Sequence, residues 1–246
     1  MLTQPKKQST LKIFSHLPLF VLLCFLFIPS ISPVSANMLI SDAILHFEPG
    51  KPLRKDIEIE NVGDETMYVQ VEPMIVRSPG TEDEEREIYK DPREAGLLVT
   101  PNKIVIPPKG RKLVRFVVLK RPTEKDAVYR VTFRPVTNGV VGEKDQIGIK
   151  VILAYQVLVL VQPINPNPDL IVKRTGNQLK FKNKGNTNVL LREGKQCPSK
   201  NASEDECEIL KGHRLYAGNE WSVELPSKHP VEYYISIGKK NSIEQY

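Results

Sequence analysis

The stretch Q-I-G-I-K-V-I-L-A-Y-Q-V-L-V-L-V-Q, residues 146–162, decides the fold. Its first half carries an apolar side chain at every second position, which on a β-strand places them on one face: Ile147, Ile149, Val151 and Leu153. Residues 157–161 are continuously apolar, as in a strand that is buried on both faces. A strand of about seventeen residues would span roughly 55 Å, whereas ordinary strands hold about five or six residues. The stretch is therefore either one long core strand of a β-sandwich or a strand whose first half offers an apolar ridge to another polypeptide.

The first 36 residues have the pattern of a secretory signal peptide. Lys6, Lys7 and Lys12 precede an apolar core at residues 17–28, and small residues lead up to Ala36. The apolar core is shorter than the ~20 residues of a membrane-spanning helix. We predict export with cleavage after Ala36 and no stable membrane insertion of the mature chain; the alternative is an uncleaved anchor.

The mature chain, residues 37–246, is long enough for two domains of about 100 residues each. Removing the signal takes three lysines and no acidic residue from a formal net charge of +6, which leaves +3. This mild charge does not indicate binding to nucleic acid. The mature cysteines, Cys197 and Cys207, lie close together in an exported chain, so we predict one disulfide. A zinc site is the alternative, although no second pair of ligands lies near them.

Short alternating segments recur every 8 to 15 residues, with Pro or Gly between them and no helical period. This pattern predicts an all-β protein built of immunoglobulin-type sandwiches. Residues 163–168 contain three prolines, which cannot continue a central strand and form a stiff connector. We therefore predict an N-terminal domain over 37–162, a linker over 163–168 and a smaller β-sandwich domain over 169–246. The acidic run at 82–87 is predicted to be a solvated loop.

No constellation of residues in the sequence indicates catalysis. The mature histidines, His46, His213 and His229, are scattered and lack metal-ligand spacing. Nucleophile elbows, phosphate-binding loops and dinucleotide fingerprints are absent from the sequence. We therefore expect a protein that is not an enzyme and has no cofactor or metal.

Several motifs together resemble one protein family. T-P-N-K-I-V-I-P-P-K-G-R-K-L-V-R-F at 100–116 is followed by V-Y-R-V-T-F at 128–133 and then by the long alternating stretch. This order resembles the periplasmic chaperones of chaperone–usher pili. G-L-L-V-T-P at 96–101 and N-x-G-N at 183–186, followed by the two cysteines, resemble the alternative (α-fimbrial) branch of that family.

The resemblance implies a boomerang of two immunoglobulin-like domains with a cleft between them. Such chaperones are periplasmic and bind pilin subunits that lack their last strand. They lend a strand to the pilin, cap it against premature assembly and deliver it to an outer-membrane usher. Here the lent strand would carry the four apolar residues of the opening stretch, at 147–153, into the groove of the pilin. The exposed strand would also allow the free chain to self-associate.

The resemblance departs from the best-known branch at one point. There an Arg on the first strand and a Lys late in the lent strand hold the C-terminal carboxylate of the pilin, whereas this chain has Ile44 and Leu158. On a strand at 128–136 the side chains that alternate with Tyr129, Val131 and Phe133 face away from the core. They are the candidates for the carboxylate anchor: Arg130, Thr132 and Arg134. The alternative is an Arg that pairs with an acid of the same sheet, as we expect for Arg115.

Two other functions are compatible with an exported immunoglobulin-like chain. One is a structural pilin or adhesin subunit, which should lack its own last strand and carry a free alternating N-terminal arm. The other is a two-domain binding module of another kind. The long stretch and the short N-terminal segment before the first turn favour the chaperone.

Overall fold

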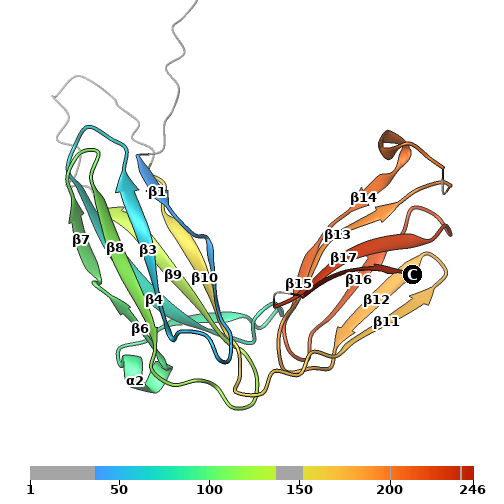
Figure 1. The fold of residues 1–246 in the computed structure, drawn as a ribbon, viewed down its shortest axis with the longest axis horizontal. Coiled ribbons are helices and arrows are strands. Elements are labelled where there is room, and N and C mark those ends of the chain that lie inside the picture. The colour runs from blue at the N-terminus through green and yellow to red at the C-terminus, as the bar shows by residue number, and fades with distance from the viewer. Residues whose placement is uncertain (1–36, 137–151, 200, 239) are drawn as a thin grey trace, which may run out of the picture. The chain divides into compact units, whose positions relative to one another are not determined.

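The computed structural model describes residues 37–136, 152–199, 201–238 and 240–246. The described residues are almost entirely β, and their strands form two separate groups, one before and one after residue 165 (Figure 1). Each group contains two sheets around a core of its own. The predicted all-β fold of two immunoglobulin-like sandwiches is therefore confirmed.

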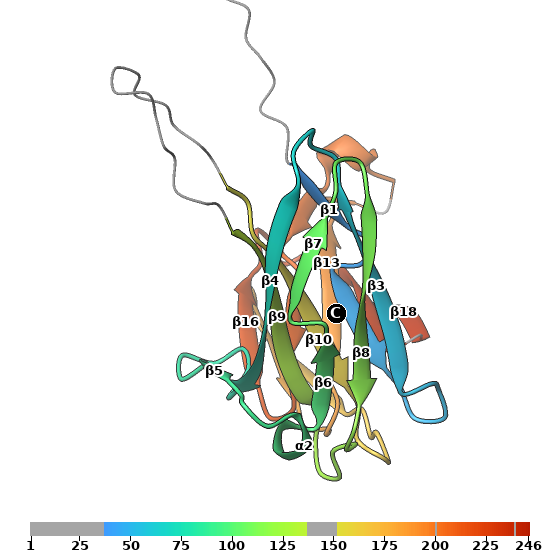
Figure 2. The same cartoon turned by 90° about the vertical axis from the view of Figure 1, so that its left-hand side faces the viewer.

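The first sandwich has one sheet with the strand order β1-β3-β8-β6 and a second with the order β2-β10-β9-β4-β5, in which β7 also pairs with β4. Figure 2 shows β4 and β9 side by side in the second sheet. The first sheet consists of β1 (Met38–Ile40), β3 (Arg54–Asn61), β8 (Arg111–Val118) and β6 (Leu97–Thr100). The second consists of β2 (Ile44–Phe47), β10 (Tyr155–Val161), β9 (Ala127–Val136), β4 (Met67–Arg77), β5 (Glu85–Ile88) and β7 (Lys103–Ile106).

Alternation in the sequence explains the core of this sandwich. On β3 Ile57 and Ile59 are fully buried, and on β9 Tyr129, Val131 and Phe133 are buried, as the period of two predicts. The opposite face of the first sheet is polar. There Arg115 donates to Asp56 through Nε at 2.9 Å and Nη2 at 3.2 Å, so the ion pair expected for Arg115 is confirmed.

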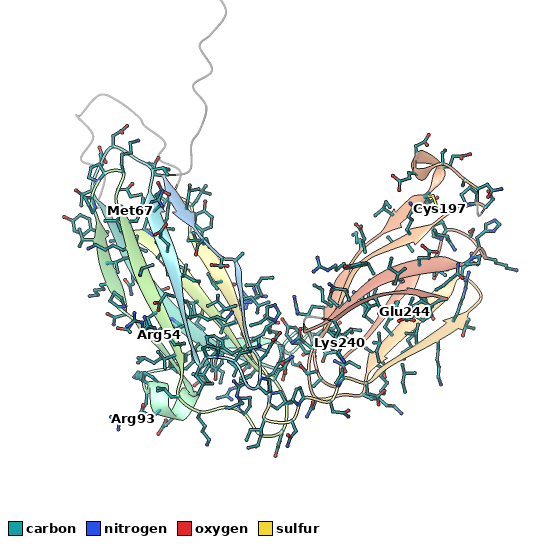
Figure 3. All side chains as sticks on the ribbon, in the orientation of Figure 1. Arg54, Met67, Arg93, Cys197, Lys240 and Glu244 are labelled. Atoms are coloured by element: carbon teal, nitrogen blue, oxygen red, sulfur yellow. A yellow bond between two sulfur atoms is a disulfide. The ribbon has the colours of Figure 1, made fainter. Side chains whose placement is uncertain are left out.

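The second sandwich is built in the same way from shorter strands. One sheet has β11 (Leu170–Thr175), β12 (Gln178–Asn183) and β16 (Glu220–Glu224). The other has β14 (Glu208–Leu210), β13 (Val189–Gln196), β17 (Val231–Ile237) and β18 (Lys240–Gln245), with β15 (His213–Leu215) also paired with β13. Its core centres on Phe181, whose ring lies 5.0 Å from that of Tyr233 and 5.7 Å from that of Trp221. The predicted disulfide between Cys197 and Cys207 is confirmed (Figure 3).

Three features differ from the sequence-based predictions. The acidic run is not all loop, because Glu85–Ile88 forms the edge strand β5 against β4. A short helix, α2 (Pro92–Ala95), was not predicted, although Asp91 caps it by accepting from the Arg93 N–H and Gly96 ends it at φ 86°. The polar strand β18 was not predicted either, since all of its residues are exposed and none reveals a buried face.

Each sandwich holds a buried asparagine in an N-x-G turn. Asn61 Oδ1 accepts from the Gly63 N–H at 3.0 Å, and its Nδ2 donates to the carbonyls of Glu65 and Ile106. Asn183 repeats this pattern with the same spacing, using the Gly185 N–H and the carbonyls of Thr187 and Leu215. The amide side chain thus satisfies backbone groups of a turn and of a second strand at once.

We expect Asn183→Ala to lower the free energy of unfolding by about 2–4 kcal/mol, because buried backbone groups lose their partners. Urea denaturation followed by tryptophan fluorescence measures this change, since Trp221 packs on the Phe181 core nearby. The matched control is Asn186→Ala at an exposed donor, for which we expect less than about 1 kcal/mol. Equal losses for the two variants would contradict the role of Asn183.

Among the described residues no helix has the length and apolar character needed to cross a membrane.

Candidate functional site

The strand β10 is the centre of the second sheet in the first sandwich. It runs antiparallel to β9 and parallel to β2. Its valines, Val157, Val159 and Val161, face the core of the sandwich. Its leucines point to the other face, where Leu158 and Leu160 form a second buried cluster with Val76, Val128 and Tyr216. The prediction that residues 157–161 are buried on both faces is confirmed.

The predicted seventeen-residue strand is wrong in part. The strand begins at Tyr155, and residues 152–154 are described without strand pairing. Leu153, the last residue of the predicted ridge, lies outside the strand and is half exposed, because no neighbouring strand of the described chain pairs with it. The other three ridge residues, Ile147, Ile149 and Val151, lie outside the described residues.

The two positions that lack the charges of the best-known branch lie side by side. Ile44 on β2 pairs with Leu158 on β10, and Leu158 pairs in turn with Arg130 on β9. Cross-strand partners share a face of the sheet, so Arg130 occupies the same row, one strand away from Leu158. Among the described residues, Arg130 has no ion pair and no side-chain hydrogen bond. Its guanidinium therefore retains its donors for another acceptor.

The other two anchor candidates are in different environments. Thr132 is buried, and its Oγ1 accepts a hydrogen bond from Gln156 Nε2 at 3.1 Å. Arg134 is exposed, and its Nη2 donates to Glu72 Oε2 at 3.0 Å. The structure thus keeps Arg130 and Thr132 on adjacent rows of one face, whereas Arg134 already has an acidic partner.

Further charged groups surround Arg130. Burial alone would raise the pKa of Glu84, but the Gly80 N–H, Arg86 and, more weakly, Arg130 hold it below its ordinary value. Burial lowers the pKa of Arg214, and the positive charge of Arg130 adds to this effect. Two guanidinium groups that influence each other favour an anion between or beside them. Sequence analysis missed Arg214, because nothing local in the sequence relates a residue of the second sandwich to β9.

Asp126, just before β9, connects the two sandwiches. Its Oδ2 accepts from the Asn188 backbone N–H at 2.8 Å and from Thr187 Oγ1 at 3.2 Å, and the Asn188 side chain bonds both Asp126 and Arg214. Gln162, at the end of β10, also donates to Thr187 Oγ1 at 3.2 Å. Burial raises the pKa of the Asp126 carboxyl, and the hydrogen bonds from Asn188 and Thr187 oppose this shift only in part.

This raised pKa predicts a pH dependence of stability. A carboxyl whose pKa is higher in the folded state stabilises the fold at low pH, and that contribution is lost as the pH rises above about 4 and through the raised value. We therefore expect the free energy of unfolding of Asp126→Asn, relative to the unmodified chain, to increase from pH 4 to pH 7. Urea denaturation at a series of pH values measures it. A difference that stays constant or falls with pH would contradict the assignment.

Among the described residues, no group of three or more histidine, cysteine, aspartate or glutamate side chains is placed to hold a metal ion.

Comparison with known proteins identifies the fold. No protein-family model matches the sequence. The chain is 31% identical over 157 residues to the CS1 fimbrial B subunit of Escherichia coli, covering 61% of this chain and 65% of that protein, slightly less than two thirds of its length. It is 27% identical over 195 residues to the CFA/I fimbrial A subunit of Escherichia coli, covering 77% of this chain and 79% of that protein.

Among solved structures, the Class 5 fimbriae chaperone CfaA superposes with a TM-score of 0.61 at 21% identity, covering 85% of this chain and 98% of CfaA. The chain has the fold of the fimbrial chaperones. The SafB chaperone of Salmonella enterica, solved in complex with the SafA pilin, also gives a TM-score of 0.61 at 13% identity, over 87% of this chain and 98% of the matched chain. The predicted resemblance to fimbrial assembly chaperones is thereby confirmed at the level of the fold.

Proposed function

We propose that this protein is a periplasmic chaperone that binds pilin subunits by donor-strand complementation and delivers them to an outer-membrane usher. One observation carries the proposal: 98% of the chaperone CfaA, through both of its domains, is matched by this chain. The 36-residue leader supports export, with cleavage after Ala36. We assign the protein no catalytic activity and no cofactor, since the proposed action consists only of binding.

The donated segment is residues 147–153, which lead directly into β10. Strand addition of this kind is the known mechanism of chaperone–pilin complexes: main-chain hydrogen bonds supply affinity, and alternate side chains fill pockets. In this chain the alternate side chains are Ile147, Ile149, Val151 and Leu153. At roughly 1.5–3 kcal/mol per fully buried aliphatic side chain, these four residues would dominate the free energy of binding.

The C-terminal carboxylate of the pilin would be held by Arg130, with the Thr132 hydroxyl beside it. Arg130 is in the row of Leu158 and lacks an acidic partner among the described residues, and its charge reaches Arg214. A carboxylate that leaves water requires charge-assisted donors, which these guanidinium groups provide. Arg134 would contribute less, because it is exposed and paired with Glu72.

A structural pilin is the second candidate, because both curated relatives bear the name of fimbrial subunits. A pilin of this type lacks its own last strand. In this chain β10 lies between β2 and β9, and its valines contribute to the core. The filled strand position favours the chaperone over the pilin.

The test is co-purification of the chain from periplasm with a candidate pilin, followed by hydrogen exchange with and without that pilin. We expect new protection across residues 147–153 and near Arg130. A folded chain that recovers no pilin, or that gains protection only in loops, would overturn the proposal. A chain that instead accepts a strand from another protein would be identified as a pilin itself.

A further inference from the structure

The last strand of the second sandwich has an unpaired edge. β18 pairs with β17 on one side, and no described strand pairs with its other side. All six of its residues are exposed, which distinguishes it from the half-buried strands beside it. Ile243 has the largest exposed fraction, 66%, of the exposed large apolar side chains in the described chain. Such an edge is a template for pairing with another strand.

The hydrogen-bond pattern shows which residues of β18 face this open edge. Val231 and Tyr246 exchange two backbone hydrogen bonds, of 3.0 and 2.9 Å. Hydrogen-bonded and non-hydrogen-bonded pairs alternate along an antiparallel ladder. Counting back from Tyr246, every second residue of β18 therefore bonds to β17. The backbone N–H and C=O groups of Asn241, Ile243 and Gln245 point to the open edge.

The side chains of β18 are arranged symmetrically about Ser242. Lys240 and Glu244 are each two residues away from it, on the face that pairs with Ile237 and Tyr233. Neither Lys240 nor Glu244 forms an ion pair with a described residue; Figure 3 labels both. Two opposite charges at equal distances from a central residue are complementary to themselves in an antiparallel arrangement.

We propose that β18 pairs with β18 of a second copy of this chain, antiparallel and with a two-fold axis at Ser242. In this register Lys240 lies opposite Glu244 of the second copy, and the same pair forms again across the axis. Each Asn241 lies opposite an Ile243, and these pairs exchange backbone hydrogen bonds through the groups left free at the edge. The two Ile243 side chains become diagonal neighbours on one face, where apolar side chains are in reach of each other.

Charge reversal tests this register. The contact is small, so the purified chain should dimerise weakly, with a dissociation constant on the order of 10–500 μM measured by sedimentation equilibrium. Lys240→Glu and Glu244→Lys should each weaken the dimer by about tenfold or more, since each places like charges opposite one another twice. The double variant Lys240→Glu plus Glu244→Lys should restore the dissociation constant to within about threefold.

Two controls separate this surface from others. Ile243→Asp should weaken the dimer, whereas Ile209→Asp, at a 63% exposed isoleucine on β14 at the other edge of the same sheet, should leave it unchanged. Ile149→Asp plus Val151→Asp, in the proposed donor segment, should also leave it unchanged. A monomer at all concentrations up to about 1 mM, failure of the double reversal to restore association, or loss of the dimer only in the donor-segment variant would overturn the proposal.

Discussion

Ile149→Asp combined with Val151→Asp is expected to abolish capture of a pilin while leaving the chaperone folded. Each aspartate would bring an unpaired carboxylate into an apolar groove of the pilin. Loss of two buried aliphatic side chains alone removes roughly 3–6 kcal/mol, which corresponds to a decrease in affinity of about 10²- to 10⁴-fold. Titration of the purified chaperone against a pilin, followed by tryptophan fluorescence or calorimetry, measures the loss.

The matched control places two aspartates at the alternate positions of the same segment, Gln146→Asp and Lys150→Asp. These side chains would point away from the groove if the segment is donated as a strand, so we expect less than about a tenfold loss. The circular dichroism and thermal unfolding of both variants should match those of the unmodified chain. Undiminished capture by the Ile149 and Val151 variant would refute donation by this segment.

Arg130→Ala is expected to weaken binding of a full-length pilin by about 10- to 150-fold. A hydrogen bond to a charged group contributes about 1.5–3 kcal/mol, and Arg130 has donors that no described residue uses. The same substitution should have little effect on a pilin whose C-terminal carboxylate is replaced by an amide. The four dissociation constants form a double-mutant cycle whose coupling energy reports the contact between Arg130 and the carboxylate.

Arg134→Ala is the matched control, four residues away on the same face of β9. Its guanidinium is exposed and paired with Glu72, so we expect a loss of less than about threefold and no coupling to the carboxylate. Equal losses with both forms of the pilin would show that Arg130 acts through the stability of the sheet. The anchor would then have to be sought elsewhere.

Much of the fold could be predicted because alternation along a strand is a local property. The period of two placed Tyr129, Val131 and Phe133 in the core and Arg130 on the opposite face, and the structure agrees. The continuous apolar run at residues 157–161 similarly identified a strand with two buried faces. Alternation failed at residues 152–154, because an alternating sequence forms a strand only where a neighbouring strand supplies hydrogen bonds.

The sequence by itself therefore determined the fold class, the disulfide and the faces on which the side chains of β9 and β10 lie. Only the tertiary structure placed Arg130 in one row with Leu158 and Ile44, brought Arg214 within electrostatic reach of it and joined Asp126 to Asn188. It also revealed β18, whose polar and fully exposed residues carry no periodic signal. The physical reason is that facing depends on neighbours one or two residues away. Pairing register and contacts between sandwiches instead join residues separated by tens of positions, which no local pattern encodes.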